Sequence, residues 1–145
     1  RDDTMLTALI AAAWVGAILI FIVTVSPTVF QALSMEQASR FLRAYFPKLF
    51  LLELTVGASL VFSGLTYAQW WFAMSGFAIA AMAALNYWVL MPAINRVSDD
   101  LSALAEPDPR LKRQFGRLHG ASTVLFGLGG LLSLYILGAY WRESQ

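Results

Sequence analysis

Long runs of apolar residues separated by short polar connections dominate the pattern of this chain. A helix needs roughly 20 apolar residues to cross a bilayer. Four runs reach that length: Met5–Val25, Leu49–Tyr67, Trp70–Met91 and Ala121–Tyr140. The pattern predicts an all-α fold, an integral membrane four-helix bundle that forms one domain over residues 1–145. The first run is longer than the apolar core of a secretion signal and follows net acidic residues, so we interpret it as a retained span.

The composition agrees with this fold and indicates that the chain lies in a lipid bilayer. The chain is 59% hydrophobic and 13% charged, whereas soluble domains are about 45–50% apolar and about 25% charged. The apolar surplus predicts the lipid bilayer as a partner, and helical spans indicate the inner (cytoplasmic) membrane because outer-membrane proteins are barrels. A net charge of +1 gives no argument for a nucleic-acid partner. The lack of cysteine excludes disulfides and thiolate metal sites.

Basic residues are distributed asymmetrically between the two ends of the spans. Of ten, only Arg1 and Arg142 lie on the side that the two termini share. The other eight lie between the first and second or the third and fourth spans: Arg40, Arg43, Lys48, Arg96, Arg110, Lys112, Arg113 and Arg117. Positive residues in short loops stay cytoplasmic, so we expect both termini on the outer side. The residues expected at the cytoplasmic membrane surface are Arg40, Arg43, Lys112, Arg113 and Arg117.

The polar connections carry helix start and stop signals. Ser34-Met-Glu-Gln37 has the pattern of a capping box, which predicts a short amphipathic interfacial helix over Met35–Phe46, with Pro47 then in the first turn of the second span. Pro27 should kink the first helix or mark its exit from the membrane. The third span is expected to continue past Pro92 as Ala93–Ala105, until Glu106-Pro-Asp-Pro109 breaks it.

Small residues recur at helix-packing spacing in the third and fourth spans. The expected packing residues are Gly76, Ala80, Gly116, Gly120 and Gly127. Rows of small residues let helices approach closely in lipid. We expect contacts within the bundle, with a homo-oligomer contact or space for a ligand as the alternatives.

Polar residues inside the spans gather in the expected cytoplasmic half. Glu53 is the one acidic residue well inside a span, where an ionisable group costs roughly 2.5–3.5 kcal/mol on insertion scales. At similar depth lie His119, Asn86, Ser122 and Gln31. These groups either hold the bundle together through hydrogen bonds or line a cavity for a ligand or ion. In the second case Glu53 and His119 would form a titratable pair.

Cofactor and catalytic signals are sparse. His119 is the only histidine, so haem held by two histidines of one chain is impossible, and the five methionines lack the clustering of a copper site. No phosphate loop, nucleophile elbow or metalloprotease motif occurs. We therefore predict no catalytic residue, no metal ligand, and neither haem nor copper as a cofactor.

Several short motifs, in order along the chain, resemble a known family. They are Ser26-Pro27-x-x-Phe30, Tyr45-Phe46-Pro47, Asn86 followed by Pro92 and Asn95, and Phe115-x-x-Leu118-His119-Gly120-x-Ser122. In these the chain resembles the transmembrane-protein-205-like family, a four-helix membrane domain of unknown function, and it is distantly similar to the copper-resistance protein D group. The resemblance implies a four-span fold and highlights Asn86, Pro92, His119 and Ser122.

These observations favour a polytopic inner-membrane protein that binds or passes a small molecule or ion through a polar cavity in its cytoplasmic half. The alternative is an accessory or assembly subunit of a larger membrane complex, without an activity of its own. An enzyme that uses bound haem or metal is a third hypothesis, which a coloured purified protein would support.

Overall fold

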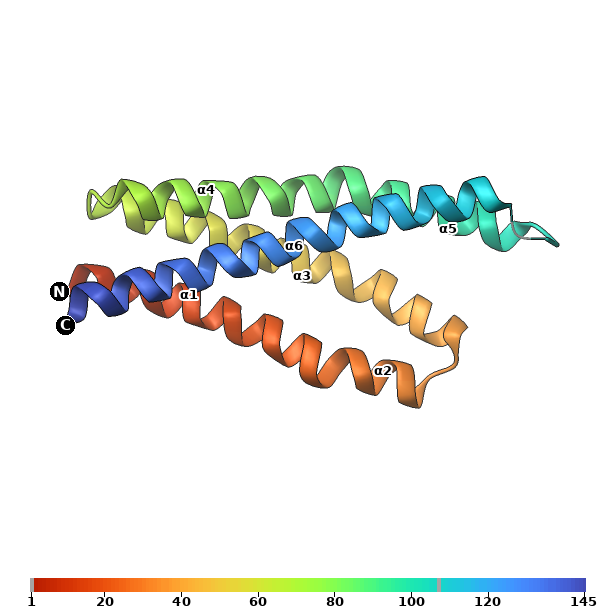
Figure 1. Ribbon diagram of the computed structural model, residues 1–145, viewed down its shortest axis with the longest axis horizontal. Helices are drawn as coiled ribbons and strands as arrows, with labels where there is room; N and C mark the ends of the chain where they lie inside the picture. Colours follow the sequence, from red (N-terminus) through yellow and green to blue (C-terminus); the bar gives the residue numbers. More distant parts are fainter. Residues whose placement is uncertain (1, 107) are drawn as a thin grey trace.

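The computed structural model describes residues 2–106 and 108–145, and these are helical apart from short connections (Figure 1). The elements are α1 (Asp2–Ile20), η1 (Phe21–Val25), α2 (Ser26–Ala32), α3 (Met35–Thr66), α4 (Trp70–Leu85), η2 (Asn86–Leu90), α5 (Met91–Ala103) and α6 (Pro109–Ser144). Four continuous helical segments are long and apolar enough to cross a membrane: Met5–Ala32, Met35–Thr66, Trp70–Ala103 and Pro109–Arg142. The prediction of an all-helical, multi-pass membrane protein is confirmed to this extent.

Two of the spans pass through a proline by way of a π turn. The Ser26 N–H donates to the Phe21 carbonyl at the end of η1, and the Met91 N–H donates to the Asn86 carbonyl at the end of η2. Each wide turn comes just before a proline, where the ring would otherwise press on the carbonyl four residues earlier. The helix therefore continues beyond Pro27 to Ala32, further than the predicted end of the first span at Val25.

The segment predicted as a short interfacial helix is instead the beginning of α3. Its start is as predicted, since the Ser34 hydroxyl accepts from the Gln37 N–H at 3.3 Å and the Gln37 side chain accepts from the Ser34 N–H at 3.0 Å. The helix then runs through Pro47 without a break to Thr66. Across this proline the Phe46 and Phe50 rings stack with centroids 5.8 Å apart, a favourable contact between successive turns.

Both termini lie at one end of the bundle, with the turn between α3 and α4 (Figure 1). The connections from α2 to α3 and from α5 to α6 lie at the opposite end, which we call the connection end. The core nearer the termini is closed, because Trp14, Leu60, Ile79 and Ile136 of four different helices are fully buried there or nearly so. A hydrogen bond of 2.6 Å between the Thr7 and Ser63 hydroxyls adds a polar link from α1 to α3.

Helices α3 and α4 pack backbone against backbone, and glycines allow this contact. A Cβ on Gly57 would lie 2.6 Å from the Ala80 nitrogen, and one on Gly76 would lie 2.7 Å from the Leu60 Cβ. Gly64 is packed as tightly against Ala73. Gly76 and Ala80, expected from the sequence to pack within the bundle, lie in this contact.

Three other glycines expected at a helix contact do not lie in one. A Cβ on Gly116, Gly120 or Gly127 would meet nothing within 4 Å. All three are exposed on α6, so their expected packing role within the bundle is not found. The row faces away from the neighbouring helices because the orientation of α6 is set by its other, buried face, which includes Ser122, Gly129 and Ile136.

Candidate functional site

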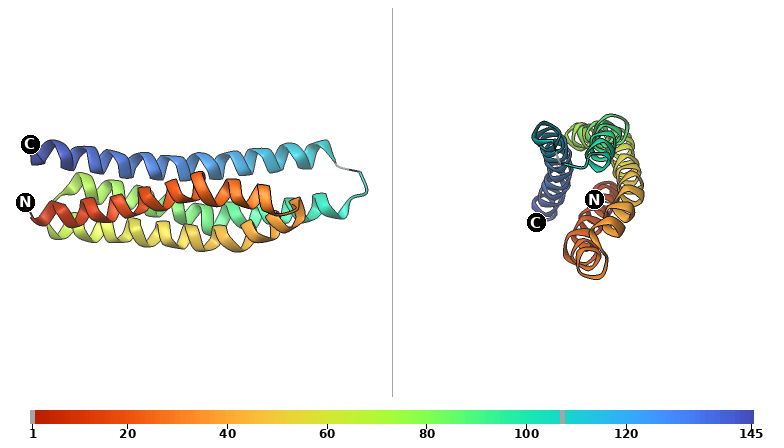
Figure 2. Two further views of the ribbon diagram at one scale, coloured as in Figure 1. Left: turned by 90° about the horizontal axis from the view of Figure 1, so that it is seen from below. Right: turned by 90° about the vertical axis from the view of Figure 1, so that its right-hand side faces the viewer.

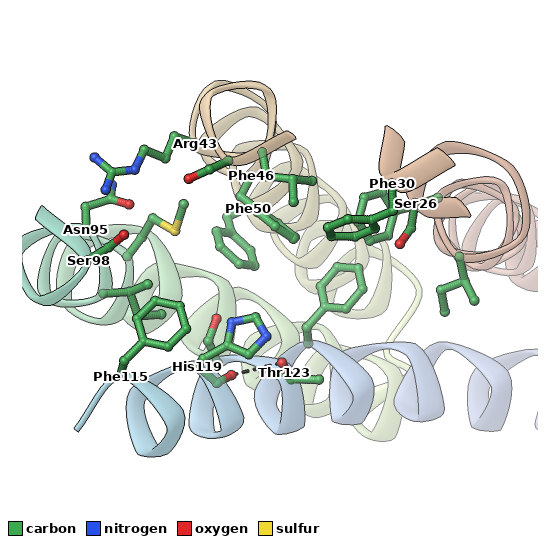
Figure 3. A pocket seen from close by; sticks show the side chains of 18 of the residues that line it. Ser26, Phe30, Arg43, Phe46, Phe50, Asn95, Ser98, Phe115, His119 and Thr123 are labelled. Carbon is green, nitrogen blue, oxygen red and sulfur yellow. Dashed lines mark hydrogen bonds between the residues drawn. The ribbon is translucent and has the colours of Figure 1, made fainter. Parts of the chain in front are cut away.

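A cavity of about 570 Å³ lies between η1, α2, α3, α5 and α6, toward the connection end (Figure 3). Here α2 diverges from α6, as the side and end-on views show (Figures 1 and 2). The volume falls within the roughly 300–1,000 Å³ of small-molecule sites. A second, smaller cavity of about 450 Å³ lies beside Trp88, Pro92 and Gln114.

The interior of the cavity is mainly aromatic and aliphatic. Six phenylalanines line it: Phe21, Phe30, Phe46, Phe50, Phe115 and Phe126. The Phe50 and Phe126 rings meet edge to face with centroids 6.2 Å apart, so α3 and α6 contact each other at the deep end. Spacings of four residues on α3, from Phe46 to Phe50, place successive rings on one helix face. Such a surface is complementary to the apolar part of a molecule.

Polar side chains cluster at the cavity's shallow end, which we call the polar rim: Ser39, Arg43, Asn95 and Ser98. The Arg43 Nη1 lies 2.6 Å from the Asp99 Oδ1, an ion pair that links α3 to α5. The Arg43 side chain remains 33% exposed. In Figure 3, Arg43, Asn95 and Ser98 lie together on one side of the opening. The charged group of the site therefore lies at one end, and the remaining lining is mainly apolar with isolated polar groups such as His119 and Thr123.

Of the five predicted cavity residues, His119 and Ser122 line the cavity and three do not. The His119 ring stacks on Phe115, with centroids 5.8 Å apart and planes within 5° of parallel. Gln31 is exposed on α2, outside the lining. Glu53 and Asn86 are fully buried within the bundle instead.

Glu53 and His119 do not meet. The Glu53 carboxylate lies against Gly129, which is ten residues beyond His119 on α6. Ten helical residues correspond to roughly 15 Å along the axis. Glu53 and His119 therefore do not form the titratable pair that the sequence suggested.

The buried polar groups differ in how well they are satisfied. The Asn86 amide donates to the Ser122 carbonyl at 3.4 Å, which ties η2 to α6. Within the described part of the chain, neither Glu53 carboxylate oxygen has a hydrogen-bond partner, and the same holds for the Trp14 indole nitrogen. The hydrogen-bonding role expected for these groups is thus seen for Asn86 and not for Glu53.

The predicted membrane-surface residues all lie toward the connection end. Arg40 pairs with Glu36 at 2.5 Å on the exposed face of α3. Lys112, Arg113 and Arg117 follow the Asp108 cap at the start of α6, where the Asp108 side chain accepts from the Arg110 N–H at 2.7 Å. Among residues 2–106 and 108–145, no group of three or more His, Cys, Asp or Glu side chains is placed to hold a metal ion.

Sequence reasoning missed the polar rim on α5 and the phenylalanine lining. A signal for the α5 part of the rim is present, because Met91, Ile94, Asn95 and Ser98 recur at spacings of three and four, as one face of a helix does. The pattern does not reveal that this face borders an open cavity.

A comparison with known proteins identifies the family of this chain. A family model described as a domain of unknown function (DUF4149) matches residues 9–103. The chain belongs to the DUF4149 family. The DUF4149 match runs from within α1 to the end of α5 and so includes the polar rim and four of the six cavity phenylalanines. No curated protein and no solved structure matches the chain. No match supports the transmembrane-protein-205-like family or the copper-resistance protein D group for this DUF4149 protein.

Proposed function

We propose that this DUF4149 protein is an inner-membrane protein that binds a small amphipathic molecule in the cavity between η1, α2, α3, α5 and α6. The observation that carries the proposal is the cavity itself, about 570 Å³ in volume, with six phenylalanines in its interior and a polar rim at one end. Sites for small molecules are mostly apolar, with few polar groups to orient the ligand.

Binding from one side fits the geometry better than passage through the bundle. Toward the termini, α3 and α4 meet at Gly57, Gly64 and Gly76, and the core there is closed around Trp14. At the cavity, by contrast, Phe30 is 53% exposed although it belongs to the lining. A lipophilic ligand therefore reaches the site from the bilayer between α2 and α6 and leaves the same way.

The proposed orientation places the polar rim near the cytoplasmic surface, with both termini on the outer side. Eight of the ten basic residues support it, since they lie toward the connection end. Retention of positive residues on the cytoplasmic side is the physical basis.

Native mass spectrometry of the protein extracted gently from its own membranes tests the binding proposal. Thr123 lines the cavity, so Thr123→Trp should fill it and remove a bound small molecule. The matched control is Val124→Trp, one residue further on α6, because Val124 is 60% exposed and is not part of the lining. We expect an adduct on the unchanged protein and on Val124→Trp, but not on Thr123→Trp. Absence of a small adduct from all three proteins would overturn the proposal.

A second candidate function, an accessory subunit of a larger complex, is favoured by one observation. Gly116, Gly120 and Gly127 form an exposed row on α6 that packs against nothing in the described chain. Small-residue rows promote helix association in lipid. Under this hypothesis Gly120→Leu releases a co-purifying membrane protein, whereas the small-molecule hypothesis predicts that the same variant keeps its adduct.

A further inference from the structure

We propose that the ligand is a single-chain anionic amphiphile, a long alkyl chain that ends in a carboxylate, with its acidic head on Arg43 and its chain among the cavity phenylalanines. This inference rests on the proposed function and names the chemical class that the cavity selects.

The proposed head-group site contains the Arg43 guanidinium, which has more N–H donors than its bond to Asp99 uses. A guanidinium has five N–H donors in a planar fork that matches a carboxylate. The bond to Asp99 is made by Nη1, and the Arg43 side chain is still one-third exposed at the edge of the cavity. Asn95 and Ser98 line the same rim and bring an amide and a hydroxyl beside the guanidinium (Figure 3).

The surrounding charge favours an anion. Between residues 26 and 120, leaving out the buried Glu53, the sequence has eight basic and five acidic residues, a surplus of three positive charges. Most of these residues lie toward the connection end, where the cavity opens. A net positive field of this kind raises the local concentration of anionic ligands. Asp99 competes for Arg43, so a bound carboxylate would share or replace that ion pair.

The depth of the cavity favours a long chain over a short acid. Phe46 and Phe50 follow Arg43 by three and seven residues on α3, which places them roughly 5 and 10 Å deeper along the helix. Phe126 of α6 closes the deep end against Phe50. A chain that starts at Arg43 can thus bury its methylene groups against aromatic rings, and each methylene group removed from water favours binding.

Photo-crosslinking tests the assignment. The full chain is placed in vesicles of neutral phospholipid with palmitate that carries a diazirine near its tail, or with the methyl ester of the same probe. We expect palmitate to label the region of Phe50 and Phe126, unlabelled palmitate to compete, and the ester to label more weakly.

Two variants separate the charge of Arg43 from its ion pair. Arg43→Gln should lower labelling by the carboxylate probe roughly tenfold and leave labelling by the ester unchanged, because it removes a charge-assisted hydrogen bond. Asp99→Asn breaks the same ion pair but keeps the guanidinium, so labelling by the carboxylate should stay equal or rise. Equal losses in both variants would assign Arg43 a structural role and overturn the inference.

The remaining outcomes distinguish this inference from the proposed function. Equal labelling by both probes, unaffected by Arg43→Gln, would overturn the anionic head group. Displacement by an anionic phospholipid but not by palmitate would overturn the single chain. If neither probe labels the cavity while the native adduct persists and is lost in Thr123→Trp, the ligand class is wrong and the binding function stands.

Discussion

The Glu53 carboxylate of α3 lies against Gly129 of α6, in the space that a side chain at position 129 would occupy. Both residues are buried, and α6 approaches α3 at this level only because one of them has no side chain. A larger residue at position 129 would therefore compete with the Glu53 side chain for the same buried space.

Gly129→Ala should lower the stability of the folded bundle, because the new Cβ would overlap the Glu53 carboxylate. Overpacking against fixed atoms costs roughly 1–3 kcal/mol, and the loss here should fall toward or below the lower end of that range because the overlap is with the end of a side chain. The measurement is the thermal unfolding midpoint of the purified protein in one fixed detergent. In a Glu53→Ala background the same substitution should cost much less, since the overlap is gone.

Gly127→Ala is the matched control for that experiment. It lies two residues away on the same helix, where an added Cβ meets nothing within 4 Å. Its midpoint should be equal to or slightly above that of the unchanged protein, because alanine has the higher helix propensity. Equal losses at positions 127 and 129 would show that the Glu53 contact does not decide the outcome.

Gly57→Ala should destabilise the contact between α3 and α4. The added Cβ would lie 2.6 Å from the backbone nitrogen of Ala80, and backbone cannot move aside as the end of a side chain can. We expect a loss of roughly 1–3 kcal/mol in a reversible unfolding measurement. Gly116→Ala, which meets open space, should show no loss. A loss at Gly116 alone would indicate a partner on α6 rather than packing inside the chain.

The hydrogen bond between Thr7 and Ser63 should contribute a small coupling energy. Interhelical side-chain hydrogen bonds in membranes average about 0.6 kcal/mol and reach about 1.7 kcal/mol. A double-mutant cycle with Thr7→Val and Ser63→Ala, read from reversible unfolding, measures this coupling between α1 and α3. A coupling energy of zero would mean that the two hydroxyls do not bond to each other in the membrane.

Glu53→Gln should leave the small-molecule adduct in place. Glu53 is not part of the cavity lining, and its carboxylate faces Gly129 rather than His119. Native mass spectrometry of this variant checks the prediction, with Thr123→Trp as the positive control for loss. Loss of the adduct from Glu53→Gln, with the fold intact, would move the binding site from the cavity to the buried carboxyl group.

Reporter fusions test the expected orientation. A reporter that is active only outside the cytoplasm should be active when fused after Gln145 or inserted in the turn at Ala68. The same reporter should be inactive when inserted between α5 and α6, beside Glu106. The opposite pattern would reverse the orientation inferred from the basic residues.

The sequence by itself determined the helical class, the number of spans and several helix ends. These follow from interactions between near neighbours along the chain: the length of each apolar run, the capping box at Ser34 and Gln37, and the helix break before Pro109. Backbone hydrogen bonds must be satisfied within each span in lipid, so a long apolar run leaves little choice but a helix.

Only the tertiary structure decided which faces meet. The sequence pattern predicted Gly127 as a packing residue, yet it is Gly129 that faces Glu53, and Gly127 faces open space. The separation of Glu53 from His119 depends likewise on how α3 and α6 are rotated and shifted against each other. These rotations result from the close packing of all the helices together, and the π turns before Pro27 and Pro92 adjust them further. Such long-range fits are not encoded in the spacing of residues along any single helix.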